Sequence, residues 1–185
     1  QVAVVTGAGG GIGRAVALAL SDIGAKVLLV DLAQDAGLET QALIQRTGHE
    51  AVFVKADVSN SEQVQHYVNT AMQTWGRIDV FMNNAAWQGE IHSLIDYPVD
   101  VFDKVMNINV RGVFLGMKYV LPIMLAQGRG AIINTASLGF FLATRKLGPY
   151  TASEHALMGL TKTAALEVAR KGIRVNVVCP GPVDT

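Results

Sequence analysis

The segment TGAGGGIG, residues 6–13, decides the fold that this sequence adopts. It lies between an apolar run that predicts a β-strand, Val2–Thr6, and a helical pattern, Ile12–Ile23. Glycines at such a junction permit a tight turn, close approach of the backbone to a pyrophosphate and close packing of the helix on the strand. The free N–H groups and the positive dipole end of the helix also favour a phosphate. The segment therefore predicts a dinucleotide-binding βαβ unit.

The rest of the sequence continues this alternation of short apolar runs with longer segments of helical periodicity. We expect strands at Val2–Thr6, Lys26–Asp31, Ala51–Lys55, Ile78–Met82, Ala131–Thr135 and Ile173–Val178. The helices between them are expected at Ile12–Ile23, Gln34–Thr47, Ser61–Trp75, Val99–Ala126 and Tyr150–Lys171. Continuous apolar strands are typical of parallel sheets covered on both faces. The pattern predicts a single α/β domain over residues 1–185, a Rossmann-type doubly wound parallel sheet with three α/β/α layers.

Composition limits the kinds of partner. The 185 residues suit one domain, and 15 Lys plus Arg balance 15 Asp plus Glu, so nothing favours nucleic acid or an anionic membrane. Lys and Pro interrupt the most apolar stretch, Val113–Leu125, which is shorter than the ~20 apolar residues of a membrane span. Cys179 is the only cysteine, which excludes an intrachain disulfide and favours the cytoplasm. No metal site is expected, because the histidines, His49, His66, His92 and His155, are not paired on one helix face.

The expected helix over residues 99–126 is apolar on both sides. One side carries Met106, Val110 and Val113, and the other carries Phe102 and Leu115. An outer helix that is apolar nearly all round needs a second covering surface. We therefore expect a homodimer or homotetramer that forms through the helices 99–126 and 150–171.

Asp31 predicts the choice of nucleotide. It closes the second expected strand, where a carboxylate can accept hydrogen bonds from the adenosine ribose and repels a 2′-phosphate. No Arg or Lys stands at Gly10 or Leu32 to bind such a phosphate. The sequence therefore favours NAD over NADP.

Further motifs follow along the whole chain in a fixed order. They are the glycine spacing of residues 7–13, Asp57-Val58, Asn83-Asn84-Ala85-Ala86, Asn109, the pair Ser137 and Tyr150, and Pro180-Gly181. In this combination the sequence resembles the short-chain dehydrogenase/reductase family. Ala86 stands where the family has Gly, which is a mild departure.

The resemblance implies an NAD-dependent oxidoreductase. It assigns cofactor binding to Gly7, Gly11, Ile12, Gly13, Asp31, Leu32, Asp57, Val58, Asn83, Ala85, Tyr150, Pro180, Gly181, Val183 and Thr185. It makes Tyr150 the acid/base, lets Ser137 hydrogen-bond the substrate oxygen, and lets Asn109 hold a water in a proton relay. It also implies a substrate lid after Thr185, which this sequence lacks.

Glu154 is the main departure from the family pattern. The family motif is Tyr-x-x-x-Lys, whereas here Glu154 follows Tyr150 by four residues. Side chains so spaced on a helix are neighbours, and unit charges ~5 Å apart at an effective dielectric constant of ~20 interact by about 3 kcal/mol, or roughly 2 pKa units. A lysine lowers the pKa of the phenol, whereas an ionised glutamate raises it. Neither Lys146, in a loop, nor Lys162, about 18 Å along the helix, replaces the missing cation.

Three interpretations of Glu154 remain open. In the first, Glu154 is an inactivating change in a competent dehydrogenase. In the second, it marks divergence toward an NAD-binding sensor or scaffold. In the third, it is the proton acceptor of a variant mechanism. The retention of Ser137, Tyr150 and Asn109 favours the first.

Two loops are expected to face the substrate because they follow carboxyl ends of strands. Residues 86–98 contain Trp87, and residues 138–149 contain Phe140, Phe141 and Leu142. Their apolar character favours a lipophilic or cyclic secondary alcohol or its ketone, with packing or subunit contacts as the alternative. A hydrolase is the rival class, since residues 135–139, TASLG, resemble a nucleophile elbow. This segment lacks the first glycine of a nucleophile elbow, and the sequence lacks the acidic residue followed by a histidine that a hydrolase needs downstream.

Overall fold

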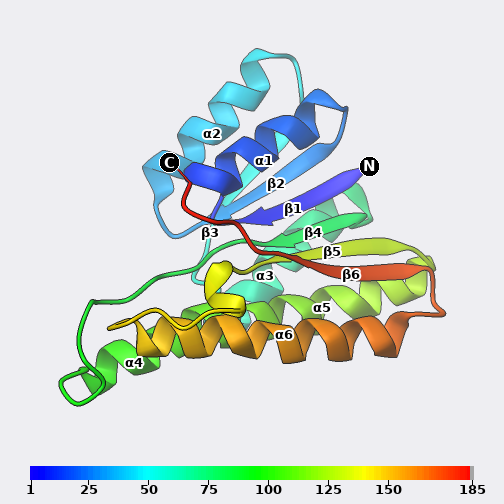
Figure 1. Ribbon diagram of the computed structural model, residues 1–185. Helices are drawn as coiled ribbons and strands as arrows, with labels where there is room; N and C mark the ends of the chain where they lie inside the picture. The colour runs from blue at the N-terminus through cyan, green and yellow to red at the C-terminus, as the bar shows by residue number, and fades with distance from the viewer. Residues whose placement is uncertain (184–185) are drawn as a thin grey trace.

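The computed structural model describes residues 1–183, except for the side chain of Phe140. Six parallel strands form one sheet in the order β3-β2-β1-β4-β5-β6 (Figure 1). Their bounds are Val2–Thr6 (β1), Lys26–Asp31 (β2), Ala51–Lys55 (β3), Val80–Asn83 (β4), Gly130–Thr135 (β5) and Ile173–Val178 (β6). This strand order reverses between β1 and β4, which confirms the predicted Rossmann-type doubly wound sheet.

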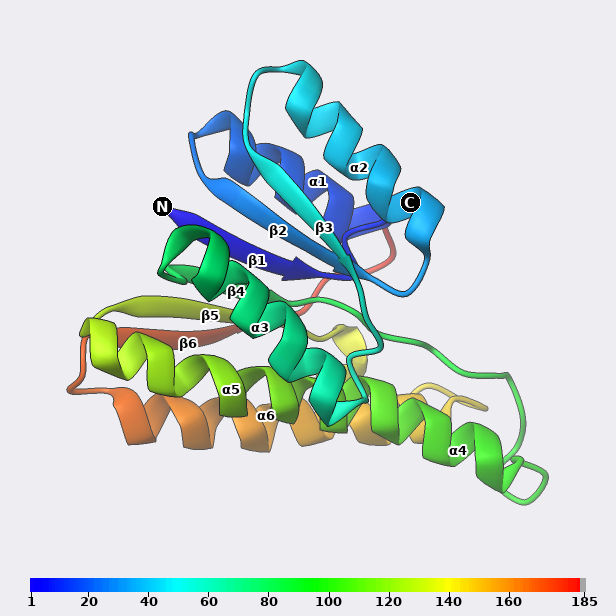
Figure 2. The same ribbon diagram turned by 180° about the vertical axis from the view of Figure 1, so that it is seen from behind.

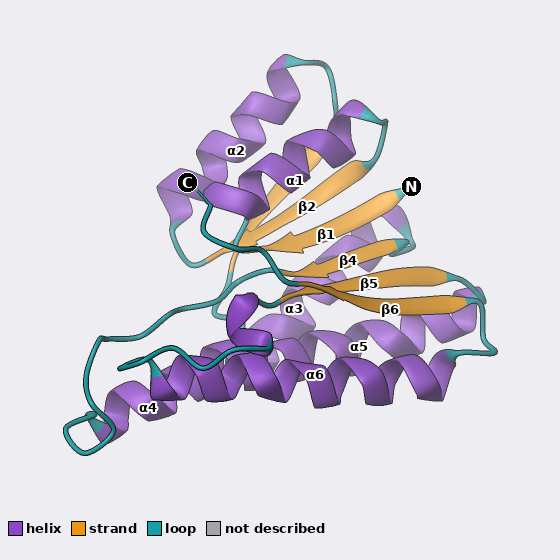
Figure 3. Ribbon diagram, viewed as in Figure 1, coloured by secondary structure: helices purple, strands orange, loops and turns teal. Residues whose placement is uncertain are grey.

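Helices cover both faces of the sheet, as Figures 2 and 3 show. The helices α1 (Gly11–Asp22) and α2 (Gln34–Arg46) lie on one face. The helices α3 (Ser61–Trp75), α5 (Gly112–Gln127) and α6 (Gly148–Val168) lie on the other, and α4 (Val99–Met106) leads into α5. One apolar core lies between the sheet and α3, α5 and α6, and a second lies under α1 and α2. The three layers are therefore confirmed.

The expected helix over residues 99–126 is interrupted by a single π-helical turn, Asn107–Arg111, between α4 and α5. A wide turn of this kind inserts one residue into the helical repeat, and such turns are frequent at functional sites. It places Asn109 against α6, whereas apolar periodicity alone gave no sign of the change.

The segment Val99–Gln127 is long and apolar enough to cross a membrane. One side of this segment is instead buried in the protein interior, since Val113, Leu115, Val120 and Met124 are buried. This segment is therefore a core helix of the domain.

Two expectations about the strands are wrong. β4 begins at Val80 and not at Ile78, because the backbone of Ile78 bonds to the Gln127 side chain. β6 is not covered on both faces, since Ile173 and Val175 are buried whereas Arg174 is exposed. Among residues 1–183, α6 packs on one face of β6 and no helix packs on the other.

Gly13 allows α1 to pack closely on the loop after β1. A Cβ atom there would lie 2.0 Å from the carbonyl oxygen of Gly7 and 2.7 Å from the Asn84 side chain. We expect Gly13→Ala to lower the free energy of unfolding by about 2 kcal/mol, measured by chemical denaturation. Gly10→Ala is the control, because a Cβ at Gly10 meets nothing within 4 Å. Equal stability of the two variants would contradict the role of Gly13.

Candidate active site

The site is built at the junction of β1 and β4, where the chain leaves the sheet toward opposite faces. The hydroxyl of Thr6 accepts hydrogen bonds from the N–H groups of Asn84 (2.9 Å) and Ala85 (3.1 Å). The side-chain amide of Asn84 donates to the carbonyl oxygen of Thr6 (3.2 Å). These bonds fix the segment after β4 against the glycine loop, and cavities open on both sides of Asn84.

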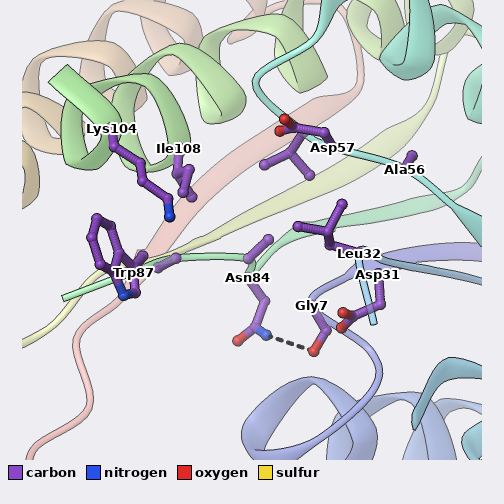
Figure 4. A pocket seen from close by; sticks show the side chains of 12 residues that line it. Gly7, Asp31, Leu32, Ala56, Asp57, Asn84, Trp87, Lys104 and Ile108 are labelled. Atoms are coloured by element: carbon purple, nitrogen blue, oxygen red, sulfur yellow. Dashed lines mark hydrogen bonds between the residues drawn. The ribbon is translucent and has the colours of Figure 1, made fainter. Parts of the chain in front are cut away.

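The first cavity has a volume of about 440 Å³ (Figure 4). Its lining includes many of the residues predicted to bind the nucleotide and several that the sequence did not single out: Gly7, Asp31, Leu32, Ala56, Asp57, Val58, Asn84, Ala85, Ala86, Trp87, Lys104 and Ile108. The Lys104 ammonium lies 4.4 Å from the centre of the Trp87 ring. Strands β1, β2 and β4 thus bring together residues from distant parts of the sequence.

The glycine loop and Asp31 fit an adenosine group in this cavity. Gly7 and Gly11 have positive φ angles, 65° and 49°, which glycine adopts without strain. The Asp31 carboxylate accepts hydrogen bonds from the N–H groups of Gly9 (2.8 Å) and Ala33 (2.9 Å). A carboxylate has about four acceptor positions, so Asp31 can also bind ribose hydroxyls.

The second cavity, of about 370 Å³, lies on the other side of Asn84 and shares Asn84 and Ala86 with the first. It is lined by Gly11, Ile12, Asn84, Ala86, Thr135, Ala136, Ser137, Tyr150, Glu154, Pro180 and Gly181. The expected catalytic side chains are therefore next to the nucleotide cavity. Two neighbouring cavities that share lining residues fit the two halves of a dinucleotide.

Ser137 and Tyr150 reach the second cavity from different elements. Ser137 follows β5, where its hydroxyl accepts a hydrogen bond from the N–H of Gly139 (2.9 Å), and Tyr150 lies in the first turn of α6. Burial raises the pKa of the Tyr150 phenol, hydrogen bonding with Ser137 lowers it, and the charge of Glu154 raises it. The net result is a raised pKa, so the phenol is protonated at neutral pH.

Comparisons with known proteins agree with this geometry. Residues 1–185 match the short chain dehydrogenase family. The chain is 42% identical to levodione reductase of Leifsonia aquatica and 38% identical to cyclohexanol dehydrogenase of Acinetobacter sp. (strain SE19), covering 100% of this chain and 70% and 74% of those proteins. The crystal structure of an NAD⁺-bound xylitol dehydrogenase superposes with a TM-score of 0.95 at 39% identity, covering 98% of this chain and 70% of that one.

This chain belongs to the short chain dehydrogenase family. As a member of this dehydrogenase family it is an oxidoreductase, and a hydrolase assignment for residues 135–139 is no longer needed. The chain spans about 70% of the length of the relatives it matches.

Glu154 is the least expected group in this short chain dehydrogenase site. Its side chain is only 1% exposed, and no described residue hydrogen-bonds to its Oε2 atom. Burial raises the pKa of its carboxyl to about 7, against a smaller lowering by the backbone of Ser137. The sequence correctly predicted that Glu154 raises the pKa of Tyr150, but burial of the phenol is the larger cause.

Asn109 is a positioning residue in the structure. Its buried amide donates to the Trp87 carbonyl (3.0 Å) and the Ser153 hydroxyl (3.0 Å), and its oxygen accepts from the Trp87 N–H (2.8 Å). Ser153 in turn donates to the carbonyl of Tyr150 (2.8 Å). Both amide hydrogens are thus bonded within the protein, whereas the amide oxygen keeps a second acceptor position. A relay water held by Asn109 stays a prediction. The side chain ties the loop at Trp87 to the first turn of α6.

Other predicted residues lie apart from the two cavities. Asn83 lines neither cavity, because its buried amide donates to Asn134 (2.9 Å) between β4 and β5, and its binding of the cofactor stays a prediction. Gly13 acts through packing, and Val183 is exposed and lines neither cavity. Thr185 and the side chain of Phe140 lie outside the described residues. Lys146 and Lys162 are exposed and line neither cavity, as their sequence positions indicated.

Asn84, Ala86, Thr135 and Ala136 line the second cavity but were not predicted to bind. The Asn-Asn-Ala-Ala segment, residues 83–86, indicated that Asn84 and Ala86 lie near the site, although it did not indicate which asparagine faces the cavity. Nothing in the sequence distinguished Thr135 from any other residue at a strand end.

The buried carboxyl predicts how stability depends on pH. Because the pKa of Glu154 is about 7 in the folded protein and 4.5 for an exposed glutamate, the folded state holds the proton more tightly. Stability is therefore fully present below pH 4.5 and decreases as the pH rises through 7, by on the order of 3 kcal/mol. Denaturant titrations from pH 4 to 8 should show this decrease relative to Glu154→Gln. Parallel curves for the two proteins would rule out a buried, titrating Glu154.

Proposed function

We propose that this oxidoreductase transfers a hydride between NAD(H) and a secondary alcohol or its ketone, with Tyr150 as the acid/base and Ser137 orienting the substrate oxygen. The observation that carries the proposal is that Ser137 and Tyr150 line a cavity next to the nucleotide cavity. The cofactor is NAD, in agreement with the Asp31 carboxylate at the end of β2.

NAD supplies the hydride acceptor, or as NADH the hydride donor, for a neighbouring carbon. The protein supplies the proton. In oxidation Tyr150 Oη takes the hydroxyl proton as hydride leaves the same carbon, and in reduction Tyr150 returns a proton to the oxygen. The Ser137 hydroxyl donates a hydrogen bond to the substrate oxygen and stabilises its developing negative charge.

The environment of Tyr150 favours reduction at neutral pH. Its raised pKa keeps the phenol protonated, which suits donation to a developing alkoxide, a far stronger base than a phenolate. Oxidation needs the phenolate, which is scarce until the pH approaches the raised pKa.

The substrate is proposed to be lipophilic or cyclic. Leu138, Phe141 and Leu142, after β5, expose 46%, 64% and 61% of their surface near Ser137. Trp87 provides an aromatic surface beside Ala86. A relative named cyclohexanol dehydrogenase makes a cyclic secondary alcohol a reasonable first probe. The role of Phe140 remains a prediction from its position in this segment.

A second candidate function is NAD binding without efficient turnover. Glu154 favours it, because the family motif has Lys four residues after Tyr, and a buried carboxyl there withholds the cation that would lower the pKa of Tyr150.

The two candidates differ in their activity across pH. We expect the protein to oxidise NADH with cyclohexanone between pH 6 and 7, and Tyr150→Phe to lose at least a hundredfold in kcat. Glu154→Lys should increase alcohol oxidation near pH 8 at least tenfold, because it lowers the pKa of the phenol. Absorbance at 340 nm measures both directions.

The outcomes separate the candidates as follows. NADH binding without turnover by the parent, together with activity of Glu154→Lys, would favour the second candidate. Full activity of Tyr150→Phe would contradict Tyr150 as the acid/base.

We also propose that the chain forms a homodimer or homotetramer through the helices of residues 99–126 and 150–171. Phe102, Phe114 and Leu166 on these helices are 42%, 46% and 80% exposed, which leaves apolar surface that a second subunit would cover. Sedimentation velocity should show an oligomer that the double substitution Phe114→Glu and Leu166→Glu dissociates. A monomeric parent at micromolar concentration would refute this assembly.

A further inference from the structure

The second cavity carries a carboxyl group and no cationic side chain. Of its eleven lining residues only Tyr150 and Glu154 are ionisable, and none is Lys, Arg or His. The Cys179 thiol after β6 also faces Glu154 electrostatically: burial, and then the charge of Glu154, raise the pKa of this thiol. Ser137 and Gly139, which approach Glu154 from the segment after β5, bring no charge. Within residues 1–183, an ionised Glu154 therefore has no ion-pair partner of opposite charge.

Unpartnered polar atoms gather in the same cavity. Among residues 1–183, the buried side-chain oxygens without a hydrogen-bond partner are Thr135 Oγ1, Glu154 Oε2 and Tyr67 Oη. Thr135 and Glu154 both line the second cavity, whereas Tyr67 lies in the core under α3. Unsatisfied buried polar atoms are costly. Two of them in one cavity point to a ligand that complements them.

We propose that Glu154 makes this site prefer the oxidised, positively charged nicotinamide over the neutral reduced form. This inference rests on the proposed function, which places the nicotinamide half of NAD in the second cavity. A buried carboxylate without a counter-ion stabilises a cation that enters beside it. It offers no such stabilisation to the uncharged dihydronicotinamide.

The expected preference is large enough to measure. At an effective dielectric constant of ~20, opposite unit charges ~6 Å apart attract each other enough to change an affinity by about a hundredfold. The cavity is open to solvent, and screening lowers this to about tenfold. The pyrophosphate and the adenosine are common to NAD⁺ and NADH, so their interactions with Glu154 cancel in the ratio of the two affinities.

The preference depends on the protonation of Glu154. Because burial raises the pKa of its carboxyl to about 7, the group is mostly neutral at pH 6 and mostly ionised at pH 8. The preference for NAD⁺ is therefore weak at pH 6 and strong at pH 8. Ketone reduction turns the neutral ring into a cation within the site, so an ionised Glu154 shifts the equilibrium between bound reactants and bound products toward the alcohol.

Binding measurements test this inference without turnover. Dissociation constants for NAD⁺, NADH and ADP-ribose would be measured by calorimetry at pH 6 and pH 8. ADP-ribose lacks the nicotinamide and reports on the rest of the cofactor site. For the parent we expect the ratio of the dissociation constants of NADH and NAD⁺ to rise about fivefold from pH 6 to pH 8, since part of Glu154 is already ionised at pH 6.

Two variants provide matched comparisons. Glu154→Gln keeps the size and a polar end group of the side chain but cannot ionise, so its ratio should not change with pH. Thr135→Val removes the neighbouring unpartnered oxygen without changing the charge, so its ratio should change as in the parent.

The results divide clearly. A constant ratio in the parent while ADP-ribose binds, or an equal rise in Glu154→Gln, overturns the inference and leaves the cofactor site intact. Failure of ADP-ribose to bind contradicts the cofactor site itself, and the inference with it. The comparison of ligands in the parent needs no variant, so it decides the matter even if a substitution prevents folding.

Discussion

The hydrogen bonds between Thr6 and the segment after β4 are the constraint on which the site depends. In a parallel sheet, neighbouring strands whose connections leave toward opposite faces open a crevice at their carboxyl ends. Thr6 and Asn84 hold the two sides of that crevice at a fixed separation. Both cavities include Asn84 and Ala86, so the nucleotide half and the catalytic half are built on one junction. Close packing of Gly13 on Gly7 keeps the glycine loop in place beneath them.

Buried polar groups then position the catalytic side chains. Asn109, in the π-helical turn, bonds to both the Trp87 backbone and Ser153, and Ser153 bonds to the Tyr150 backbone. A similar chain through Asn83, Asn134 and Thr161 joins β4, β5 and α6 in the core. Fully bonded networks of this kind are rigid. Glu154 differs, because it is buried with an unsatisfied oxygen and a raised pKa. Burial of the Glu154 carboxyl lowers the stability of the free protein. A positively charged ligand that binds beside it would stabilise its ionised form.

Much of this arrangement could be predicted from the sequence. β1, β2, β3 and β6 have the predicted bounds, because apolar β-branched runs between glycines and polar turns leave little freedom. Asp31, Ser137, Tyr150 and Glu154 face the cavities as their positions at strand ends and on α6 indicated. The features that the sequence did not predict are set by tertiary contacts. Periodicity could not reveal the π-helical turn at Asn109, which asparagine faces the cavity, or that one face of β6 lacks a helix. The isolation of the Glu154 carboxyl emerges only when α6 packs against the segment that follows β5.

The central claim is that Glu154 is a buried carboxyl that changes charge near neutral pH. Its side-chain carboxyl ¹³C chemical shift, assigned by comparison with Glu154→Gln and followed from pH 3 to pH 9 in the free protein, tests this directly. The account predicts a single titration with a midpoint pKa of about 7. A midpoint near 4.5, the value for an exposed glutamate, would contradict it, because the carboxylate would then be ionised throughout the range from pH 6 to pH 8 and the cofactor preference would not change with pH.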